Sequence, residues 1–426
     1  MNLKKIKLSS LFIILNTFVL FTSVLFIEEI YKLQFSESEY FKNQALSNRQ
    51  KVEVIEAKRG SILDREFNEV SETINAFNIG IYPEKIDDKK LVSELLAPLL
   101  QLDKAVIFER LNNNKNYFYL KRNIDFETGT KIKNWNYSGI NVEKSSKRII
   151  YSDSLTQIIG HVDPDGNGIE GLELYFDNSL KGTDGELRYE AAPNGDFIPQ
   201  GKSSILDPVH GEDLILSIDS ELQYISEDLC SEALQITQAF KCSVVFMNAE
   251  NGEIIISAEK SSINNKYFDI NLISGRALYE PGSALKIFTV GALLQNDEVN
   301  ENDTYYVEDK IEIIEESCNK NYEGLKGCFR DFLKHDPYEL TVKEIIERSS
   351  NVGTIKITQN SNVLEIENFL IKFGFGEKTG VELTGETRGG FIDNKRCVTC
   401  LSSLSIGYSV NVSQYQMVRA YSIIAN

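Results

Sequence analysis

One apolar stretch near the N-terminus is longer than a typical core helix or strand. Residues 8–27, LSSLFIILNTFVLFTSVLFI, are apolar over about twenty positions, enough to span a membrane as a helix. Three lysines precede the stretch and two glutamates follow it. The positive-inside rule then predicts that residues 1–7 are cytoplasmic and that the remaining chain lies beyond the membrane. No pair of small residues ends the stretch, so we expect an uncleaved anchor rather than a signal peptide.

The region from 31 to 205 is long and mixed in pattern. Residues 57–70, AKRGSILDREFNEV, predict a turn between extended pieces, and 163–189 predict a Gly- and Asp-rich loop, a short helix and another turn. No nucleophile is paired with a base here. We therefore interpret 31–205 as a scaffold or interaction domain.

From 206 onward the pattern predicts a hairpin followed by helices. Residues 217–234 predict an amphipathic helix whose apolar face holds Leu222, Ile225, Leu229 and Leu234. Two apolar runs within 243–258 flank Asn251-Gly252, a strong signal for a β-hairpin. Residues 283–295 follow Pro281-Gly282 and are apolar nearly all round, which predicts a buried helix.

Two capping boxes mark further helix starts. Thr341 pairs with Glu344, and Ser413 pairs with Gln416, each ahead of a run with helical periodicity. A third helix is predicted over 363–373 and ends at Gly374.

Length and charge narrow the class of protein. A chain of 426 residues is long enough for two domains, and 42% hydrophobic residues are typical of a folded protein. The net charge of -18 argues against nucleic acid as a partner, because phosphate binding needs clustered Lys and Arg. We interpret the acidity itself as a source of solubility.

Six cysteines are present, and no second C-x-x-C or His pair completes a zinc site. Cys397 and Cys400 form a C-x-x-C in a polar loop, whereas a redox motif should open a helix. We expect ordinary residues there, or a disulfide if the compartment oxidises. Cys318 with Cys328 is another candidate pair.

The candidate chemistry begins with Ser283 and Lys286. Their spacing of three places both side chains on one face of the predicted helix. A serine at a helix N-terminus also has a free backbone N–H that can donate to a developing oxyanion. Desolvation favours the neutral form of a lysine, so Lys286 is a candidate general base for the hydroxyl. The motif alone is common by chance, but burying a lysine costs on the order of several kcal/mol and needs a reason.

Ser349 and Asn351 form a Ser-x-Asn just beyond the helix that Thr341 caps. The hydroxyl can relay a proton toward Lys286, and the amide can hold a substrate amide. Taken alone, the same residues would be read as a helix C-cap.

In this order the motifs resemble a known family. Four stretches resemble the transpeptidase domain of class B penicillin-binding proteins: YEPGSALKIFT (279–289), LTVKEIIERSSNVGT (340–354), FGFGEKTGVELTGE (373–386) and LSIGYSVNVSQYQMVRAYSIIAN (404–426). Two more resemble its non-catalytic pedestal domain: RGSILDR (59–65) and GIEGLELYFDNSLKGTDG (168–185).

The resemblance implies an α+β fold and a domain order. A cytoplasmic tail (1–7) and a transmembrane helix (8–27) are followed by a mixed α/β pedestal, or dimerisation-type, domain (31–205). A transpeptidase domain with an antiparallel sheet plus helices follows (206–426). The family implies a single-pass protein of the inner membrane with its bulk in the periplasm. The compact pedestal and GFGEKTG resemble the division-specific branch, the septal peptidoglycan D,D-transpeptidases.

The resemblance also implies roles for four residues. Ser283 would attack the penultimate D-Ala carbonyl of a stem peptide, Lys286 would take its proton, and Ser349 and Asn351 would complete the second motif. The implied partners are D-Ala-D-Ala stem peptides, penicillin and other β-lactams that acylate Ser283, and membrane proteins of the division machinery. Neither a cofactor nor a metal is implied.

Lys378-Thr379-Gly380 matches a third motif of this family but is not expected to serve as it. Residues 373–386 carry four glycines and no alternating apolar run, so they predict a helix end and a turn rather than a strand. In the family the working triplet follows a stretch like AYSIIAN, where this chain stops. We therefore expect a transpeptidase domain that is incomplete at its C-terminus. A smaller departure is Ser409, which stands where the family usually has glycine.

Three alternatives stay open. The chain could be a non-catalytic scaffold of the division machinery, or belong to the elongation-specific branch. It could also be a β-lactam sensor or a serine β-lactamase, which the long pedestal disfavours.

Overall fold

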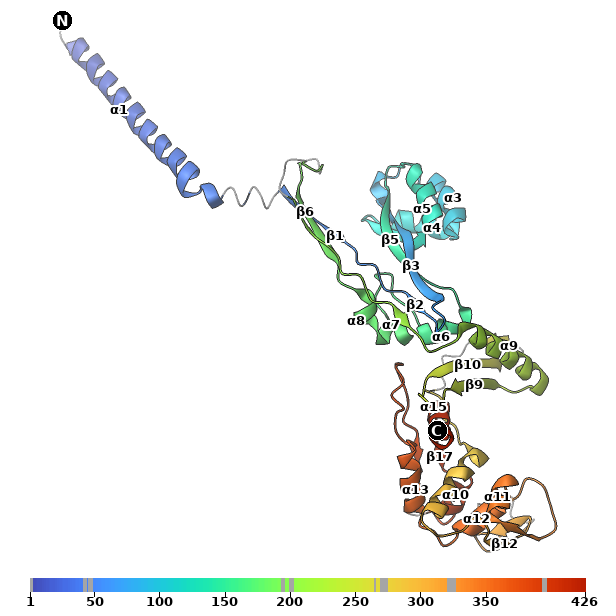
Figure 1. The fold of residues 1–426 in the computed structure, drawn as a ribbon. Helices are drawn as coiled ribbons and strands as arrows, with labels where there is room; N and C mark the ends of the chain where they lie inside the picture. Colours follow the sequence, from blue (N-terminus) through green and yellow to red (C-terminus); the bar gives the residue numbers. More distant parts are fainter. Residues whose placement is uncertain are drawn as a thin grey trace. The chain divides into compact units, whose positions relative to one another are not determined.

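A computed structural model describes residues 3–40, 44, 49–192, 196–198, 203–263, 266–268, 275–319, 327–392 and 397–426. Its contacts divide the chain into two compact units. The first unit is Met1–Lys58 with Gly182–Gly211, and the second is Arg59–Lys181 with Glu212–Asn426. The first unit is therefore built from two segments that are far apart in the sequence, drawn in blue and green in Figure 1.

The first unit holds an apolar helix and a three-stranded antiparallel sheet. Helix α1 (Leu3–Tyr31) passes into a π-helical turn (Lys32–Ser36), which confirms that residues 8–27 are helical. The segment Phe12–Phe35 is long and apolar enough to cross a membrane. The sheet has the order β1-β6-β7, with β1 (Gln50–Ile55), β6 (Gly185–Glu190) and β7 (Ser203–Leu206).

The second unit opens with a five-stranded sheet. Its order is β4-β3-β2-β8, and β5 also pairs with β3. The strands are β2 (Ile62–Leu63), β3 (Glu69–Ile81), β4 (Phe118–Asp125), β5 (Ile140–Ile150) and β8 (Leu214–Ile215). The turn predicted within 57–70 joins β2 to β3, and the Asp64 carboxylate fixes it by accepting the backbone N–H groups of Glu66 and Asn68.

Three helices pack on this sheet and form the core of the first half of the unit (Figure 1). They are α3 (Lys89–Leu100), α4 (Lys104–Asn113) and α5 (Phe126–Asn134). Each begins after an aspartate whose carboxylate accepts a free backbone N–H of the first turn: Asp88, Asp103 and Asp125. Leu96, Ile107 and Ile132 bring the helices onto Ile79 of β3, and all four side chains are buried.

A buried ionic network ties short helices to this sheet. The predicted loop and short helix after 163 are present, as α7 (Gly171–Tyr175), and α8 (Asp177–Lys181) follows it. Glu173 of α7 is fully buried and accepts from Arg59 at 2.7 Å and from Arg148 of β5 at 2.6 Å. The remaining short elements here are a 3-10 turn at Pro83–Lys85, another at Asp153–Leu155, and α6 (Thr156–Ile159).

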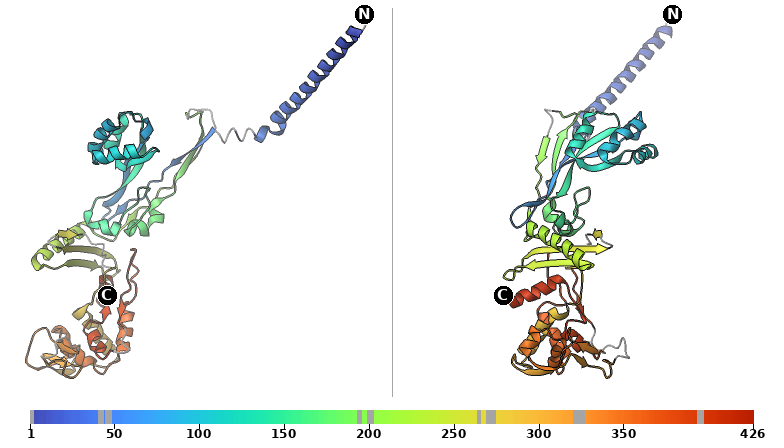
Figure 2. Two further views of the ribbon diagram at one scale, coloured as in Figure 1. Left: turned by 180° about the vertical axis from the view of Figure 1, so that it is seen from behind. Right: turned by 90° about the vertical axis from the view of Figure 1, so that its right-hand side faces the viewer.

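The predicted hairpin is confirmed as β9 (Lys241–Met247) and β10 (Ile254–Ile263), and β11 (Lys266–Phe268) pairs with β10. Gly252 takes the left-handed φ of +79° that the turn requires. Helix α9 (Ser220–Thr237) packs on both hairpin strands, and Figure 2 shows it alongside them in both views.

The helix predicted over 217–234 is correct, but its predicted buried face is wrong. Leu222, Ile225 and Leu229 are exposed, and of the four apolar residues only Leu234 is buried. The face on the hairpin instead carries Gln223, Ser226, Glu227 and Cys230. Those polar atoms are satisfied: Gln223 binds the backbone of Ser257, and Glu227 pairs with Lys260 at 2.8 Å.

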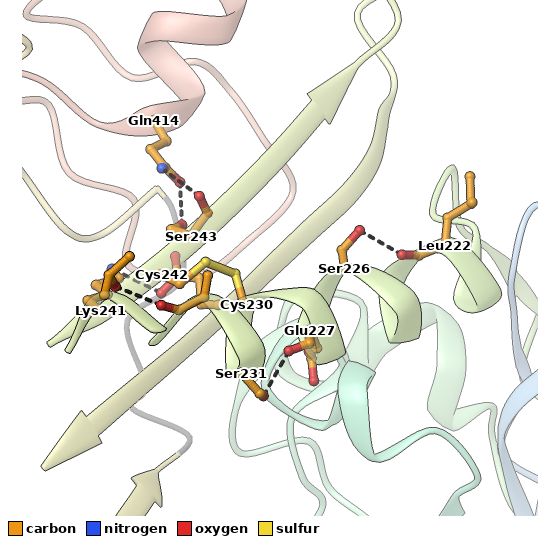
Figure 3. Close-up of a disulfide and its surroundings, with 12 residues drawn as sticks. Leu222, Ser226, Glu227, Cys230, Ser231, Lys241, Cys242, Ser243 and Gln414 are labelled. Atoms are coloured by element: carbon orange, nitrogen blue, oxygen red, sulfur yellow. Dashed lines mark hydrogen bonds and ion pairs between the residues drawn. A yellow bond between two sulfur atoms is a disulfide. The ribbon is translucent and has the colours of Figure 1, made fainter. Parts of the chain in front are cut away.

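All six cysteines form disulfides. Cys230–Cys242 joins α9 to β9, and Ser243 beside it is hydrogen-bonded to Gln414 (Figure 3). Cys318–Cys328 confirms the second predicted pair, and Cys397–Cys400 is a disulfide rather than two free thiols. The Cys230–Cys242 disulfide was not predicted from the sequence.

The remaining elements belong to the part of the chain that contains the candidate active site. The helices are α10 (Lys286–Gln295), α11 (Val342–Glu347), α12 (Asn351–Thr358), α13 (Val363–Lys372), α14 (Cys400–Ser405) and α15 (Gln414–Ala425). Short strands pair as β12 (Thr304–Val307) with β15 (Tyr338–Thr341), β13 (Lys310–Glu312) with β14 (Cys328–Arg330), and β16 (Gly390–Phe391) with β17 (Val410–Asn411). Both predicted capping boxes are formed, and Gly374 follows α13 with a φ of +89°.

Candidate active site

Ser283 lies in a single 3-10 turn, Gly282–Leu285, that leads directly into α10. The helix is held by buried Phe288, Val290 and Leu293, as the apolar run predicts. Gly282 adopts a φ of +56° and donates its N–H to the Gly407 carbonyl at 2.9 Å. Ser283 is consequently exposed at the entrance to the helix, while Lys286, one turn further on, is only 3% exposed.

The Lys286 ammonium is directed at the turn before α12. Its Nζ donates to the backbone carbonyl of Ser349 at 2.5 Å and to the Ser349 hydroxyl at 3.2 Å. Burial lowers the pKa of Lys286 to about 8, and the negative charge of Asp331 opposes that shift. The amine is therefore neutral in a substantial fraction of molecules at mildly alkaline pH, the form that a general base requires.

Ser349 and Ser350 lie between α11 and α12, and Asn351 is the first residue of α12. Ser349 has a φ of +53°, a left-handed conformation that is uncommon for a residue with a side chain. Ser350 is the N-cap of α12, and its hydroxyl accepts the Gly353 N–H at 2.8 Å. Asn351 donates its side-chain amide to the Arg330 carbonyl at 2.7 Å. The Ser-x-Asn motif is thus the start of a helix rather than the cap of the preceding one.

The structure brings Lys286 and Ser349 into contact and places Ser283 one turn away on the same segment. Within the described residues, the Ser283 hydroxyl makes no hydrogen bond. It is therefore not hydrogen-bonded to Lys286, the candidate base, which contacts Ser349 instead. Asn351 lies in the same turn but is bound to Arg330. The roles of these four residues remain predictions.

The Lys378-Thr379-Gly380 triplet lies in a loop and not on a strand, as expected for 373–386. The Glu386 carboxylate holds it, accepting the Thr379 N–H at 2.6 Å and the Gly380 N–H at 3.2 Å. Gly380 also has a φ of +84°, which a strand would not contain. The triplet is therefore a carboxylate-bound turn.

Sequence reasoning missed Asp331, an acid in the irregular segment after β14. Its carboxylate accepts from the Ser350 hydroxyl at 2.8 Å and from the Val352 N–H at 2.9 Å. Nothing in the local pattern around CFRDF distinguishes this acid from a surface aspartate. Among the described residues no cluster of three or more His, Cys, Asp or Glu side chains could hold a metal ion.

Two family models match the chain in succession. Residues 54–216 match the penicillin-binding protein dimerisation domain, and residues 242–426 match the penicillin-binding protein transpeptidase domain. The two together define a protein with a non-catalytic domain ahead of an acyl-transfer domain. The chain belongs to the class B penicillin-binding proteins. With helix α1, this membership indicates a membrane-anchored protein with a large extracytoplasmic part.

Individual relatives agree with the family. The chain is 30% identical over 387 residues to the peptidoglycan D,D-transpeptidase FtsI of Buchnera aphidicola, covering 87% of this chain and 65% of that protein. It is 26% identical to the penicillin-binding protein PbpB of Mycobacterium tuberculosis, covering 96% of this chain and 63% of that protein. The chain thus spans about two thirds of the length of these curated relatives.

A solved structure has the same fold. That structure is the complex between penicillin-binding protein PBP2 and MreC from Helicobacter pylori. The match has a TM-score of 0.70 and 21% identity, covering 88% of this chain and 77% of that chain.

Proposed function

We propose that this chain is part of a membrane-anchored peptidoglycan D,D-transpeptidase that cross-links stem peptides through an acyl-enzyme on Ser283 during septal cell-wall synthesis. The observation that carries the proposal is the buried Lys286, which lies one turn from an exposed serine and against Ser349. A buried amine with a lowered pKa beside a weak nucleophile is the arrangement that activates a serine. The match of residues 242–426 to a penicillin-binding transpeptidase model supports the same reaction class.

The proposed reaction has two acyl transfers. In the first, Lys286 removes the Ser283 hydroxyl proton while the oxygen attacks the penultimate D-Ala carbonyl carbon of a stem peptide. The bond to the terminal D-Ala nitrogen breaks, and that nitrogen leaves as an amine after receiving the proton. In the second, the amine of a neighbouring stem peptide attacks the ester, and Ser283 regains its proton. A β-lactam, which presents a strained amide in place of the D-Ala-D-Ala bond, would stop after the first transfer.

Asn351 and Ser349 are proposed to act on the substrate and the proton respectively. The Asn351 carboxamide would exchange its bond to the Arg330 carbonyl for a substrate amide, since a side-chain amide can both donate and accept. The Ser349 hydroxyl, which accepts from Lys286, can pass a proton onward. No cofactor enters this scheme.

The location and partners of the chain follow as part of the proposal. We place residues 1–7 in the cytoplasm, residues 8–27 in the inner membrane and the remaining chain in the periplasm, because Lys4, Lys5 and Lys7 precede the apolar stretch. D-Ala-D-Ala stem peptides, β-lactams and membrane proteins of the division machinery are the proposed partners. Nucleic acid is not expected at a net charge of -18.

Covalent labelling with a fluorescent penicillin tests the proposal. The wild-type chain should become labelled, mass spectrometry should place the adduct on the peptide containing Ser283, and Ser283→Ala should remain unlabelled. Ser231→Ala is the matched control, because the Ser231 hydroxyl only binds the Glu227 carbonyl of its own helix. Absence of labelling in the folded wild-type chain would favour the non-catalytic scaffold instead.

A further inference from the structure

Asp331 connects the loop after β14 to the turn that faces Lys286. One carboxylate oxygen accepts the Val352 N–H, and the other accepts the Ser350 hydroxyl and lies 3.1 Å from Nε2 of His335. The side chain is only 9% exposed. The adjacent Arg330 carbonyl accepts the Asn351 amide. Two consecutive residues of this loop therefore hold the three residues that begin α12.

The turn at Ser349 needs hydrogen bonds from other segments to keep its conformation. Ser349 has left-handed backbone geometry, which costs about 1–2 kcal/mol for a residue with a side chain and persists only where neighbours enforce it. On its N-terminal side the Ser349 N–H binds the Ile346 carbonyl at 3.0 Å. On its C-terminal side the Ser350 N–H binds the Ile345 carbonyl at 3.0 Å, and Asp331 accepts both the Ser350 hydroxyl and the Val352 N–H. Loss of Asp331 would remove two of the hydrogen bonds that fix the turn whose carbonyl and hydroxyl receive Lys286.

Asp331 also acts on Lys286 through its charge. Burial lowers the pKa of the amine, and the Asp331 carboxylate opposes that effect by stabilising the charged form. Among the described residues, His335 contacts the Asp331 carboxylate, and the negative charges of Asp331 and Asp309 help to raise the pKa of the His335 imidazole. The same carboxylate thus contributes both to the geometry and to the electrostatics of the proposed base.

We propose that Asp331 is a positioning residue that holds the Ser349 turn against Lys286 and acts on that amine through its negative charge. This inference rests on the proposed function in one respect: acylation of Ser283 is the most direct way to measure the effect of Asp331. A role confined to capping α12 would alter stability without altering the pH dependence of acylation.

The test compares Asp331→Asn, Asp331→Ala and the wild-type full chain. The second-order rate constant for acylation by a fluorescent penicillin is measured from pH 6 to pH 10. Asp331→Asn removes the charge but keeps an acceptor, so the midpoint of the profile should move to lower pH by about half a unit or more. Asp331→Ala removes both, and its limiting rate should fall more than tenfold. Thermal unfolding verifies that each variant is folded.

Asp219→Asn is the matched control. Asp219 is the N-cap of α9 and accepts the Leu222 N–H at 3.0 Å, so the change is the same at another helix start. Its rate and midpoint should equal those of the wild type. Either a wild-type midpoint in Asp331→Asn or a rate within twofold of wild type in Asp331→Ala would overturn the inference.

A second readout separates this inference from the proposed function. If the folded wild-type chain is not acylated, the proposed function fails, and the Lys286 pKa is then followed by NMR of lysine labelled with ¹³C at Cε. The pKa should be lower in Asp331→Asn than in the wild type. An unchanged pKa would contradict the inference whatever the outcome of labelling.

Discussion

The side-chain amide of Gln223 binds the backbone of Ser257 twice, accepting its N–H at 2.9 Å and donating to its carbonyl at 3.0 Å. Ser257 lies on β10 opposite Val245 of β9. The glutamine of α9 therefore gives β10 the pair of hydrogen bonds that another strand would give. This explains how a polar residue that is 1% exposed can occupy the face of α9 that packs on the hairpin.

Gln223→Leu should destabilise the fold. The replacement has a similar size but leaves the Ser257 N–H and carbonyl without partners, at an expected cost of about 2–3 kcal/mol. Gln235→Leu, at an exposed position of the same helix, is the control and should change stability little. Denaturant unfolding followed by circular dichroism measures both. Equal stabilities of the two variants would show that the paired bonds contribute nothing.

The rate of acylation should rise with pH and reach half its limit near pH 8. Lys286 has a pKa lowered to about 8, and only its neutral form, present above that value, can accept the Ser283 proton. Each pH unit below the midpoint should lower the rate about tenfold. Lys286→Arg should abolish the reaction, because a guanidinium does not lose its proton in this range. Stopped-flow measurements with a penicillin check this, and a flat profile from pH 6 to pH 10 would exclude Lys286 as the base.

The Glu173 network should be essential to the sheet of the pedestal. Glu173→Ala leaves the buried Arg59 and Arg148 without their shared partner and should cost about 3–5 kcal/mol. Glu127→Ala, which removes an exposed pair with Lys131 on α5, should change the stability little, because solvent screens the two charges. Trp135, the chain's one tryptophan, directly follows α5, so its fluorescence in urea reports unfolding of this region. Similar urea midpoints for the two variants would contradict the prediction.

The Cys230–Cys242 disulfide should stabilise the chain more than Cys397–Cys400. The first closes a loop with a sequence separation of 12 and the second a loop with a separation of 3. The chain-entropy estimate gives about 3 kcal/mol for the longer loop and about 2 kcal/mol for the shorter one. Calorimetry on the two double Cys→Ser variants compares them. The opposite order of melting temperatures would show that strain or local packing outweighs loop length.

Short sequence motifs correctly predicted the elements whose ends are fixed by interactions between neighbouring residues. The boxes at Thr341 and Ser413 mark true helix starts, and Asn251-Gly252 marks a true hairpin, because these side chains act within a few residues of themselves. The apolar run after Ser283 likewise gave a buried helix and a buried lysine.

The face of α9 and the contacts of Asp331 could not be predicted in this way. Gln223 is buried because of a strand that lies 34 residues further along the chain, and Asp331 binds a residue 19 positions away. A periodic pattern assigns apolar residues to the interior. It contains no information about a polar residue, such as Gln223, that is buried because it hydrogen-bonds to a strand backbone. The turn that carries Ser349 and Asn351 depends on such contacts between residues that are distant in the sequence.

The disulfides join each cysteine to the next one along the chain: first with second, third with fourth, fifth with sixth. In the orientation proposed above, the part of the chain beyond the apolar helix crosses the membrane in sequence order and exposes its cysteines in that order. Each thiol therefore meets its own partner before a competing one has emerged, and each link can close while later residues are still in transit. In that proposed orientation, biogenesis would need an oxidant at the exit of the translocation channel but little subsequent reshuffling of mispaired bonds.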